Sequence, residues 1–375
     1  MVIVVNTRLL LKNRLEGIGW FTYETLKRIT RDHPGHQFIF LFDRKYDEEF
    51  VFASNVKPVV VWPPTRHVSL MYFWFNWRIP RILKKFKADV FVSPDGNLSL
   101  HTKIPQLAVI HDINFLHRPK DLPCIVAKYY NYFFPRFARK AKKLVTVSSF
   151  SRDDIAVNFN IPDHKIDVVY NGCNREYSPI SKEEAAATRS EYSSGDPYFL
   201  FIGALHPRKN IEGLLRAFDL YRLKTNSIVK LLIVGGQMFK TSSISETLQQ
   251  MQFKDEVIFT GRLPTAELKK VLGGALALTF VPFFEGFGIP VLEAFSAGIP
   301  VISSNTTSLP EVGGDAVLYV NPENDAEIAE AMHRIGNNAE LRSALIEKGN
   351  LQLKKFSWDD SAEKLWKIIE QTGRL

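Results

Sequence analysis

Two glutamates in the second half of the sequence stand in an apolar stretch that contains three glycines. The stretch, FFEGFGIPVLEAFSAGIPV, carries Glu285 and Glu293. A carboxylate can accept hydrogen bonds from two neighbouring hydroxyl groups, and the N–H groups of a glycine turn or a helix start attract anions. The pattern therefore favours a site for phosphate and sugar over a metal site. Either glutamate by itself could instead neutralise a helix terminus or face solvent, although charges are rare in so apolar a run without a partner.

Arg208 and Lys209 form a second candidate group, in the stretch FIGALHPRKNIEGLLRAF. A strand is predicted to end at Gly203, and Asn210 is predicted to cap the helix that follows. The two cations would then lie just before a helix N-terminus, where arginine can bridge two phosphate oxygens and lysine adds a point charge. This arrangement predicts diphosphate binding, and an ordinary solvated Arg-Lys pair is the alternative.

The first half of the sequence holds two further candidates. Gly17 and Gly19 follow the first predicted strand, but the full GxGxxG fingerprint of a dinucleotide site is absent. They form either a turn that lets the backbone approach a ligand or a purely structural turn. His111 and Asp112 directly follow an apolar strand, so the imidazole is expected at the ligand edge of the sheet. A structural histidine at a strand end is the alternative.

Short apolar runs alternate with helical patterns along the whole chain. The predicted strands span residues 2–5, 37–42, 59–62, 90–93, 107–110, 144–147, 198–203, 230–234, 257–260, 275–281, 301–303 and 316–320. The predicted helices span residues 19–30, 79–86, 125–141, 211–223, 266–272, 291–297 and 325–335. Pro135 is expected to kink or break the third of these helices. Within the opening stretch, Pro290 suits the first turn of its helix and Gly298 suits the end.

This alternation is typical of parallel α/β sheets. The polar residues 171–197 are the predicted linker between two Rossmann-type domains. The carboxyl ends of the strands of both sheets are expected to face each other across a cleft, where ligands bind.

The composition fits a globular protein of 375 residues with two domains. Residues 1–172 carry 26 Lys and Arg against 15 Asp and Glu, whereas residues 173–375 carry 22 against 25. A basic half can face nucleic acid, anionic lipid or a phosphorylated substrate, but no nucleic-acid-binding module is present in the sequence.

Cys124 and Cys173 show no disulfide or zinc pattern. No apolar run in the sequence is long enough to span a bilayer. The apolar run at the N-terminus is not preceded by the basic residues of an export signal, so we expect a cytoplasmic protein.

Aromatic and basic side chains are interleaved in residues 66–87 and 128–143. This mixture suits a membrane surface and a lipid-linked phosphate acceptor. A buried helical stripe accounts for part of it, namely Ile79, Ile82, Leu83 and Phe86. Lipid contact, as an alternative to core packing, is expected from the remaining side chains Trp74, Trp77, Arg78, Arg81 and Lys85.

The order and spacing of several motifs resemble the retaining GT-B glycosyltransferases of family GT4. The motifs are VIHDINFLHRP, VSSFSRDDI, FNIPDHKIDVVYNGCN, FLFIGALHPRKNIEGLLRAF, VIFTGRLPTAELKKVL and FVPFFEGFGIPVLEAFSAGIPVISSNTTSLPEVGGDAVLYVNPENDAEIAEAM. The resemblance covers most of the chain and is most specific in EGFGIPVLE and PRKN. It implies an acceptor-binding domain in residues 1–172, a nucleotide-sugar-binding domain in residues 173–355, and a last helix in residues 356–375 that crosses back to the first domain.

The resemblance also implies a role for each candidate residue. Glu293 would hold the ribose hydroxyls, Glu285 would face the hydroxyls of the donor sugar, and His111 would line the sugar pocket. Arg208 and Lys209 would neutralise the diphosphate as it leaves. The other implied donor contacts, largely through backbone, are Gly17, Gly19, Gly203, Gly261, Arg262, Leu263, Gly286, Phe287 and Gly288. The glycine pair that is usual in the first loop of the family reads Glu16-Gly17 here.

The implied reaction moves a hexose from a GDP- or UDP-linked sugar to a glycan or lipid-linked acceptor in cell-surface polysaccharide assembly, with retention of configuration. Negative charge develops on the departing diphosphate, so positive groups at the phosphate matter more than a strong base. No DxD-like metal signature lies near the site, and we expect no metal and no cofactor besides the nucleotide sugar as co-substrate.

Peripheral contact with the inner face of the membrane is expected through the basic domain, and nucleic acid is not expected as a partner. The alternatives are a sugar-nucleotide 2-epimerase or hydrolase on the same scaffold, or a non-catalytic sugar-nucleotide-binding protein.

Overall fold

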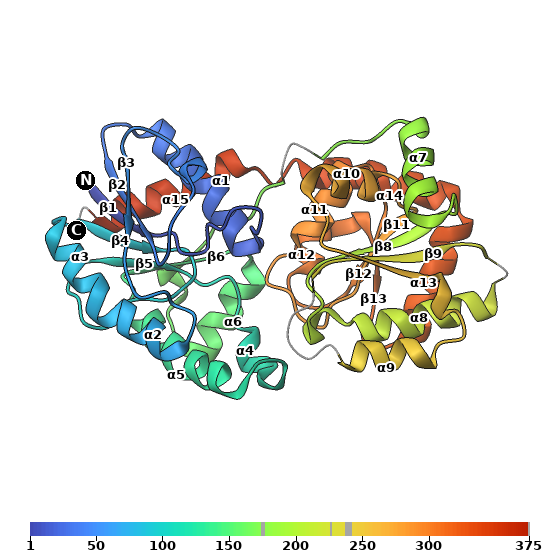
Figure 1. Ribbon diagram of the computed structural model, residues 1–375, viewed down its shortest axis with the longest axis horizontal. Helices are drawn as coiled ribbons and strands as arrows, with labels where there is room; N and C mark the ends of the chain where they lie inside the picture. The colour runs from blue at the N-terminus through green and yellow to red at the C-terminus, as the bar shows by residue number, and fades with distance from the viewer. Residues whose placement is uncertain (174–176, 226, 237–241, 374–375) are drawn as a thin grey trace. The chain divides into compact units, whose positions relative to one another are not determined.

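The chain forms two compact units, each a parallel β-sheet with helices on both faces (Figure 1). Unit 1 consists of Met1–Gly172 and Ser357–Leu375, and unit 2 consists of Cys173–Phe356. The computed structural model describes residues 1–173, 177–225, 227–236 and 242–373. The α/β class with two Rossmann-like units is confirmed.

Unit 1 is built on a seven-stranded sheet in the order β3-β2-β1-β4-β5-β6-β7, and all neighbouring strands are parallel. The strands are β1 (Val2–Asn6), β2 (Gln37–Phe42), β3 (Val56–Val60), β4 (Val90–Ser93), β5 (Gln106–Val109), β6 (Lys143–Thr146) and β7 (Ile166–Val168). The chain runs outward from β1 through β2 and β3 and then returns to pair β4 with the other side of β1. The topological switch point of this sheet therefore lies between β1 and β4, where α/β proteins bind ligands.

Helices cover both faces of the unit 1 sheet (Figure 1). One layer contains α1 (Gly17–Asp32) and α15 (Trp358–Gly373). The other contains α2 (Val68–Phe73), the π-helical turn η2 (Trp74–Arg78), α3 (Ile79–Lys85), α4 (Asn114–His117), α5 (Cys124–Lys140) and α6 (Ser149–Phe159). Alternate strand residues, including Val4, Ile39 and Phe91, form one buried core with this second layer. Successive side chains of a strand point to opposite faces of the sheet, so each helix layer packs against its own group of apolar strand residues.

The last helix, α15, packs against unit 1. Trp366 stacks on His33 with ring centroids 3.9 Å apart. The Arg28 side chain of α1 pairs with Asp359 at 2.6 Å, and the Ser361 hydroxyl donates to the carbonyl of Tyr170 at 2.6 Å. After completing unit 2, the chain therefore returns to the first sheet and buries an apolar helix face there.

Unit 2 repeats the architecture with a six-stranded parallel sheet in the order β10-β9-β8-β11-β12-β13. The strands are β8 (Tyr198–Ile202), β9 (Lys230–Val234), β10 (Val257–Gly261), β11 (Ala277–Phe280), β12 (Val301–Ser304) and β13 (Val317–Val320). The helices are α7 (Lys182–Ser193), α8 (Ile211–Lys224), α9 (Ser242–Gln250), α10 (Thr265–Gly273), α11 (Ile289–Ser296), α12 (Leu309–Gly313), α13 (Asp325–Asn337) and α14 (Ala339–Leu353). The switch point of this sheet lies between β8 and β11.

The prediction of a linker across residues 171–197 is wrong in its second half. Helix α7 occupies part of this range and packs against α10. Ser181 caps the helix, because its hydroxyl accepts a hydrogen bond from the N–H of Glu184 at 3.1 Å. The Ser-x-x-Glu spacing is a capping-box signal that outweighs the polar composition. Residues 174–176 of the predicted linker lie outside the described residues.

Other expectations also fail against the structure. Helix α5 continues across Pro135, so the break that this proline predicts does not occur. Trp74, expected among the lipid contacts, is fully buried, and its indole N–H donates to the carbonyl of Val61 at 2.8 Å. An indole that is enclosed and hydrogen-bonded in this way belongs to the core.

Gly172 is predicted to be essential for seating α15. A Cβ atom at this position would lie 2.4 Å from the backbone nitrogen of Trp358, so Gly172→Ala must displace the start of the helix. We expect the variant to lose about 2 kcal/mol of stability, which is typical of overpacking, and to unfold at a lower temperature. Gly35→Ala is the matched control, because a Cβ there meets nothing within 4 Å. Equal melting temperatures for the two variants would contradict this role.

Candidate active site

Two loops at the switch point of the unit 2 sheet carry the charged residues that the sequence singled out. The loop after β8 contains the 3-10 turn Pro207–Lys209, and the loop after β11 contains Glu285. Because β8 and β11 are adjacent and parallel, both loops leave the sheet at the same edge. The backbone N–H of Phe283 donates to the carbonyl of Arg208 at 2.9 Å, which ties the two loops together.

Glu285 accepts hydrogen bonds from both cations. Its Oε2 atom lies 2.8 Å from Nη1 of Arg208 and 2.5 Å from Nζ of Lys209. Burial opposes ionisation of this carboxyl, but Lys209 and Arg208 more than offset it and lower its pKa to about 2. Glu285 is therefore ionised at neutral pH. Among these three described residues, two positive charges stand against one negative charge.

The cations are held by further contacts. The Lys209 side chain is 9% exposed, and its ammonium lies over the Phe280 ring, 4.6 Å from the centroid. Nη1 of Arg208 also donates to the carbonyl of Phe284 at 3.0 Å. Both cations are thus positioned before any ligand binds, which reduces the entropy lost on binding.

A third loop, after β12, supports the loop that carries Glu285. The hydroxyl of Ser308, which is fully buried, donates to the carbonyls of Glu285 at 2.8 Å and of Phe287 at 3.1 Å. The N–H of Glu285 donates to Oγ1 of Thr307 at 3.3 Å. Thr307 has φ of +58°, a conformation that is unfavourable for a β-branched residue and is often found at functional sites.

The loop enters α11 through Gly288. This residue has φ of +109°, and a Cβ would lie 2.7 Å from the Leu309 side chain, so only glycine fits. Pro290 lies in the first turn of α11, and Gly298 follows its end with φ of +69°, as predicted. Gly286, Phe287 and Gly288 therefore form the approach to the N-terminus of the helix that carries Glu293.

Asn210 does not cap α8 as predicted. It adopts φ of +59°, and its side chain makes no capping hydrogen bond. Instead its amide donates to the carbonyls of Val281 at 3.1 Å and of Pro322 at 2.7 Å. Asn210 thereby fixes the cationic turn to the end of β11, a role that long-range contacts decide and local sequence does not.

Glu293 lies in α11 and has a different environment from Glu285. Burial raises its pKa to about 7, although a hydrogen bond from the Tyr177 side chain counteracts part of this effect. The neighbouring Cys173 thiol has its pKa raised to about 12 by burial and by the charge of Glu293. The structure therefore brings Arg208, Lys209 and Glu285 together, whereas Glu293 pairs with Tyr177.

Glycines line the carboxyl ends of β8, β9 and β10. A Cβ on Gly235, after β9, would lie 1.8 Å from the carbonyl oxygen of Gly203, after β8. The N–H of Gly235 donates to the carbonyl of Gly261, which ends β10 with φ of +72°. Arg262 and Leu263 follow directly. The sequence reasoning did not single out Gly235 and Gly236, although two glycines after the apolar run KLLIV were a usable signal.

Of the predicted residues of unit 1, His111 follows the end of β5, whereas Gly17 and Gly19 lie in the first turn of α1. Nε2 of His111 is 3.0 Å from the carbonyl of Pro94, and burial lowers the pKa of the imidazole. A neutral imidazole that donates from Nε2 has its Nδ1 as acceptor. Gly17 is exposed as the first residue of α1, and a Cβ on Gly19 would lie 3.1–3.2 Å from Leu15 and the carbonyl of Leu9. Gly19 therefore has a packing role.

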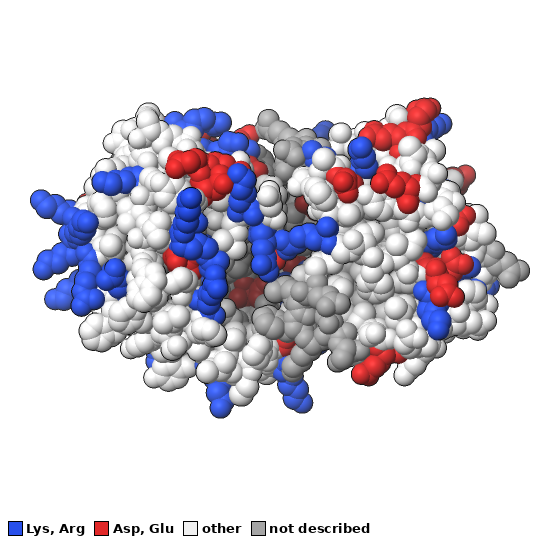
Figure 2. Space-filling model, viewed as in Figure 1, with Lys and Arg blue, Asp and Glu red and all other residues white. Residues whose placement is uncertain are grey.

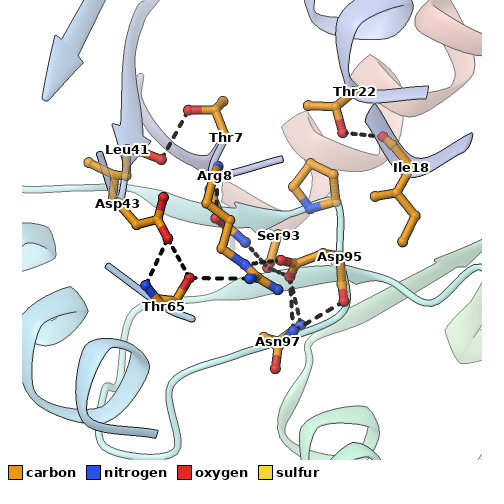
Figure 3. Close-up of polar contacts among 12 residues, drawn as sticks. Thr7, Arg8, Ile18, Thr22, Leu41, Asp43, Thr65, Ser93, Asp95 and Asn97 are labelled. Carbon is orange, nitrogen blue, oxygen red and sulfur yellow. Dashed lines mark hydrogen bonds and ion pairs between the residues drawn. The ribbon is translucent and has the colours of Figure 1, made fainter. Parts of the chain in front are cut away.

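The sequence reasoning missed a buried polar network at the switch point of unit 1 (Figure 3). Nε of Arg8, after β1, donates to Asp95, after β4, at 2.5 Å, and Nη1 of Arg8 lies 3.2 Å from the Thr65 hydroxyl. Asp95 also accepts from Ser93 and from the N–H of Asn97, both at 3.1 Å. Burial opposes the charge on Asp95, but Arg8 and these hydrogen bonds lower its pKa. No local motif marks these residues, because three different strands bring them together.

Two family profiles match the chain, "Glycosyltransferase Family 4" over residues 15–177 and "Glycosyl transferases group 1" over residues 183–352. The chain is also 29% identical to the O-antigen chain mannosyltransferase B of Escherichia coli, over 93% of this chain and 94% of that protein. It is a glycosyltransferase of the GT4 type.

Other proteins agree with this assignment. The glycosyltransferase is 28% identical to the O-antigen chain mannosyltransferase RfbU of Salmonella typhimurium, over 84% of each chain. Its fold is similar to that of Anabaena Alr3699/HepE in complex with UDP-glucose, with a TM-score of 0.75 at 13% identity, over 99% of this chain and 100% of that one. The family and the GT-B fold expected from the sequence are confirmed.

The pKa of Glu293 predicts how stability changes with pH. Its value of about 7 in the folded protein is above the ordinary 4.5, so the folded state binds this proton more tightly than the unfolded state does. The associated stability is fully present below pH 4.5 and is lost as pH rises through 7. Between pH 5 and pH 8 the free energy of unfolding should fall by about 2 kcal/mol more in the wild-type glycosyltransferase than in the Glu293→Gln variant. Urea unfolding of both proteins at the two pH values measures this, and parallel pH profiles would contradict it.

Proposed function

We propose that the protein is a retaining, metal-independent hexosyltransferase that uses a nucleotide-diphospho-sugar. The observation that carries this proposal is the cluster of Arg208, Lys209 and Glu285 at the switch point of unit 2. Its excess positive charge and its fixed cations suit a diphosphate. The position at the carboxyl ends of β8 and β11 is where doubly wound sheets bind nucleotides.

The site divides the donor into parts with different chemistry. Arg208 and Lys209 bind the diphosphate, and the N–H groups of Gly286, Phe287 and Gly288 near the start of α11 add further donors. Glu293 accepts hydrogen bonds from the ribose hydroxyls, and Glu285 faces the hydroxyls of the transferred sugar. Gly261, Arg262 and Leu263 contact the base, chiefly through backbone, and Gly203 is a further donor contact. The roles that the resemblance implies for His111, Gly17 and Gly19, which lie in unit 1, stay predictions.

The reaction gains most from charge stabilisation. As the bond between the anomeric carbon and the diphosphate breaks, positive charge develops on the sugar and negative charge on the diphosphate. Arg208 and Lys209 stabilise the departing diphosphate from fixed positions, which costs no reorganisation at the moment of reaction. The Glu285 carboxylate, ionised because both cations lower its pKa, lies on the sugar side and offsets the positive charge that develops there.

The donor is proposed to carry GDP or UDP and a hexose. Two relatives are named mannosyltransferases, and a solved structure of the same fold contains UDP-glucose. The acceptor is proposed to be a glycan or a lipid-linked glycan in cell-surface polysaccharide assembly, because both relatives are named for the O-antigen chain. The excess of Lys and Arg in residues 1–172 supports work at the inner face of a membrane.

A direct test is a screen of nucleotide diphosphates and their sugars by thermal shift, followed by product analysis with acceptor glycans. A ligand that binds only the folded state raises the melting temperature. The proposal requires one nucleoside diphosphate to stabilise the protein and its sugar to be consumed mainly when acceptor is present. Equal consumption without acceptor would indicate the epimerase or hydrolase instead, and binding without turnover would indicate a non-catalytic protein.

Substitution of Lys209 and Glu293 should separate turnover from binding. Lys209→Ala removes one charged contact to the leaving diphosphate and should lower kcat by a factor of roughly 100 to 1,000. Glu293→Ala should weaken binding of the nucleotide sugar in calorimetry by about tenfold, the effect of one lost hydrogen bond to a charged group. Lys270→Ala, an exposed position of α10, is the control. Wild-type turnover in Lys209→Ala would contradict the role of Lys209, and wild-type affinity in Glu293→Ala would contradict the role of Glu293.

Activity should persist when divalent metal is removed. The positive charge that a metal would supply to the diphosphate comes here from Arg208 and Lys209. We therefore expect the same rate in buffer with excess EDTA and in buffer with added Mg²⁺ or Mn²⁺. A rate that falls to background in EDTA and returns with metal would contradict a metal-independent site.

A further inference from the structure

An apolar groove lies on the outer surface of unit 1, between α2 and α5. Its volume is about 640 Å³. Tyr72 of α2 and Phe133 of α5 have ring centroids 5.4 Å apart, so the two helices are in contact beside it. The lining residues are Val68, Ile125, Lys128, Tyr129, Asn131, Tyr132 and Phe133. We refer to the surface formed by α2, η2, α3 and α5 around this groove as the α2–α5 face.

Large apolar side chains are exposed on the α2–α5 face. The exposed fractions are 65% for Ile125, 54% for Tyr132 and 50% for Trp77, and Phe73 is also exposed. Ile125 and Tyr132 line the groove, which is itself apolar, whereas Phe73 and Trp77 lie on α2 and η2. A cluster of exposed apolar side chains is typical of an interaction site.

The same surface is strongly basic. Residues 66–87 contain six Lys and Arg and no Asp or Glu, and residues 124–143 again contain six and none. Figure 2 shows Lys and Arg side chains gathered over α3. At the groove, Lys128 forms part of the lining, and the guanidinium of Arg136 lies over the Tyr132 ring, 3.5 Å from its centroid. This charge favours an anionic partner.

Aromatic residues, aliphatic residues and cations in one surface fit a lipid bilayer better than a nucleic acid. Trp and Tyr favour the boundary between headgroups and hydrocarbon, and Lys and Arg pair with anionic headgroups. In the described part of the chain, no helix has the length and apolarity to cross a bilayer. The surface lies along helices whose inner sides pack on the sheet, which suits contact with one leaflet.

We propose that the α2–α5 face binds the surface of an anionic phospholipid bilayer. Ile125 and Tyr132 enter the headgroup boundary around the shallow apolar groove, and Lys128 and Arg136 lie at the level of the phosphates. The inference extends the proposed function, on which it rests, by assigning the membrane contact to one surface. Of the lipid contacts expected from the sequence, Trp77, Arg81 and Lys85 are exposed on this face, Arg78 is half-buried and Trp74 is buried.

The test is co-sedimentation of the full chain with phosphatidylcholine vesicles, with and without phosphatidylglycerol. We expect binding to the anionic vesicles. Ile125→Ser with Tyr132→Ser should weaken it at least about tenfold, because partial burial of two apolar side chains is lost. Lys128→Gln with Arg136→Gln should weaken it at least about fivefold on anionic vesicles and leave the weak binding to neutral vesicles unchanged. The matched control is Val157→Ser with Leu351→Ser, since these residues are 79% and 63% exposed on helices outside the α2–α5 face.

The outcomes separate this inference from the proposed function. All three double variants should keep the thermal shift that a nucleoside diphosphate produces, because the substitutions lie outside the Arg208–Lys209–Glu285 cluster. Equal vesicle binding by the serine variant and its control would overturn the inference, as would equal wild-type binding to neutral and anionic vesicles. The glutamine variant keeps the test decisive if the serine variant folds poorly, because it removes charge at exposed positions only.

Discussion

A single carboxylate, that of Glu285, neutralises part of the charge of two cations at the switch point of unit 2. Lys209 is buried and Arg208 is partly buried, and a positive charge that is removed from water needs a partner. The end of β11 provides Glu285 at hydrogen-bond distance from both. Asn210, Ser308 and Thr307 then fix the loops that carry these groups. The parallel order of β8, β11 and β12 is what brings three loops to one edge.

Both units place a similar pair at the same topological position. In unit 1 Arg8 follows β1 and pairs with Asp95 after β4, and in unit 2 Arg208 follows β8 and pairs with Glu285 after β11. Buried ion pairs contribute little net stability, because desolvation offsets their attraction. Their position at the ligand edge of each sheet therefore fits a functional origin better than a stabilising one. The Arg8 network also supports the Pro94 turn, whose carbonyl lies next to His111.

The sequence predicted much of the fold because its strands are short, apolar and separated by turn residues. The range of β2 and of β9 agrees with the prediction at both ends, and β11 was predicted too long by a few residues. Helix α7 was missed because its polar surface suggested a linker, and Pro135 was given too much weight in α5. Local patterns describe local preferences, and packing against the sheet decides the rest.

The site was predictable where a motif carries it. Glu285, Arg208 and Lys209 were identified because charged residues follow strands in glycine-rich or helix-starting contexts. Their direct pairing was not predictable, since it depends on the adjacency of β8 and β11, which are separated by two other strands in the sequence. For the same reason, the pairing of Arg8 with Asp95 was not predictable.

The most direct measurement of the central claim is a crystal structure of the protein with its nucleotide-diphospho-sugar or a non-hydrolysable analogue. The account predicts diphosphate oxygens within hydrogen-bond distance of Arg208 and Lys209, and a diphosphate bound elsewhere, with both cations still paired only to Glu285, would contradict it.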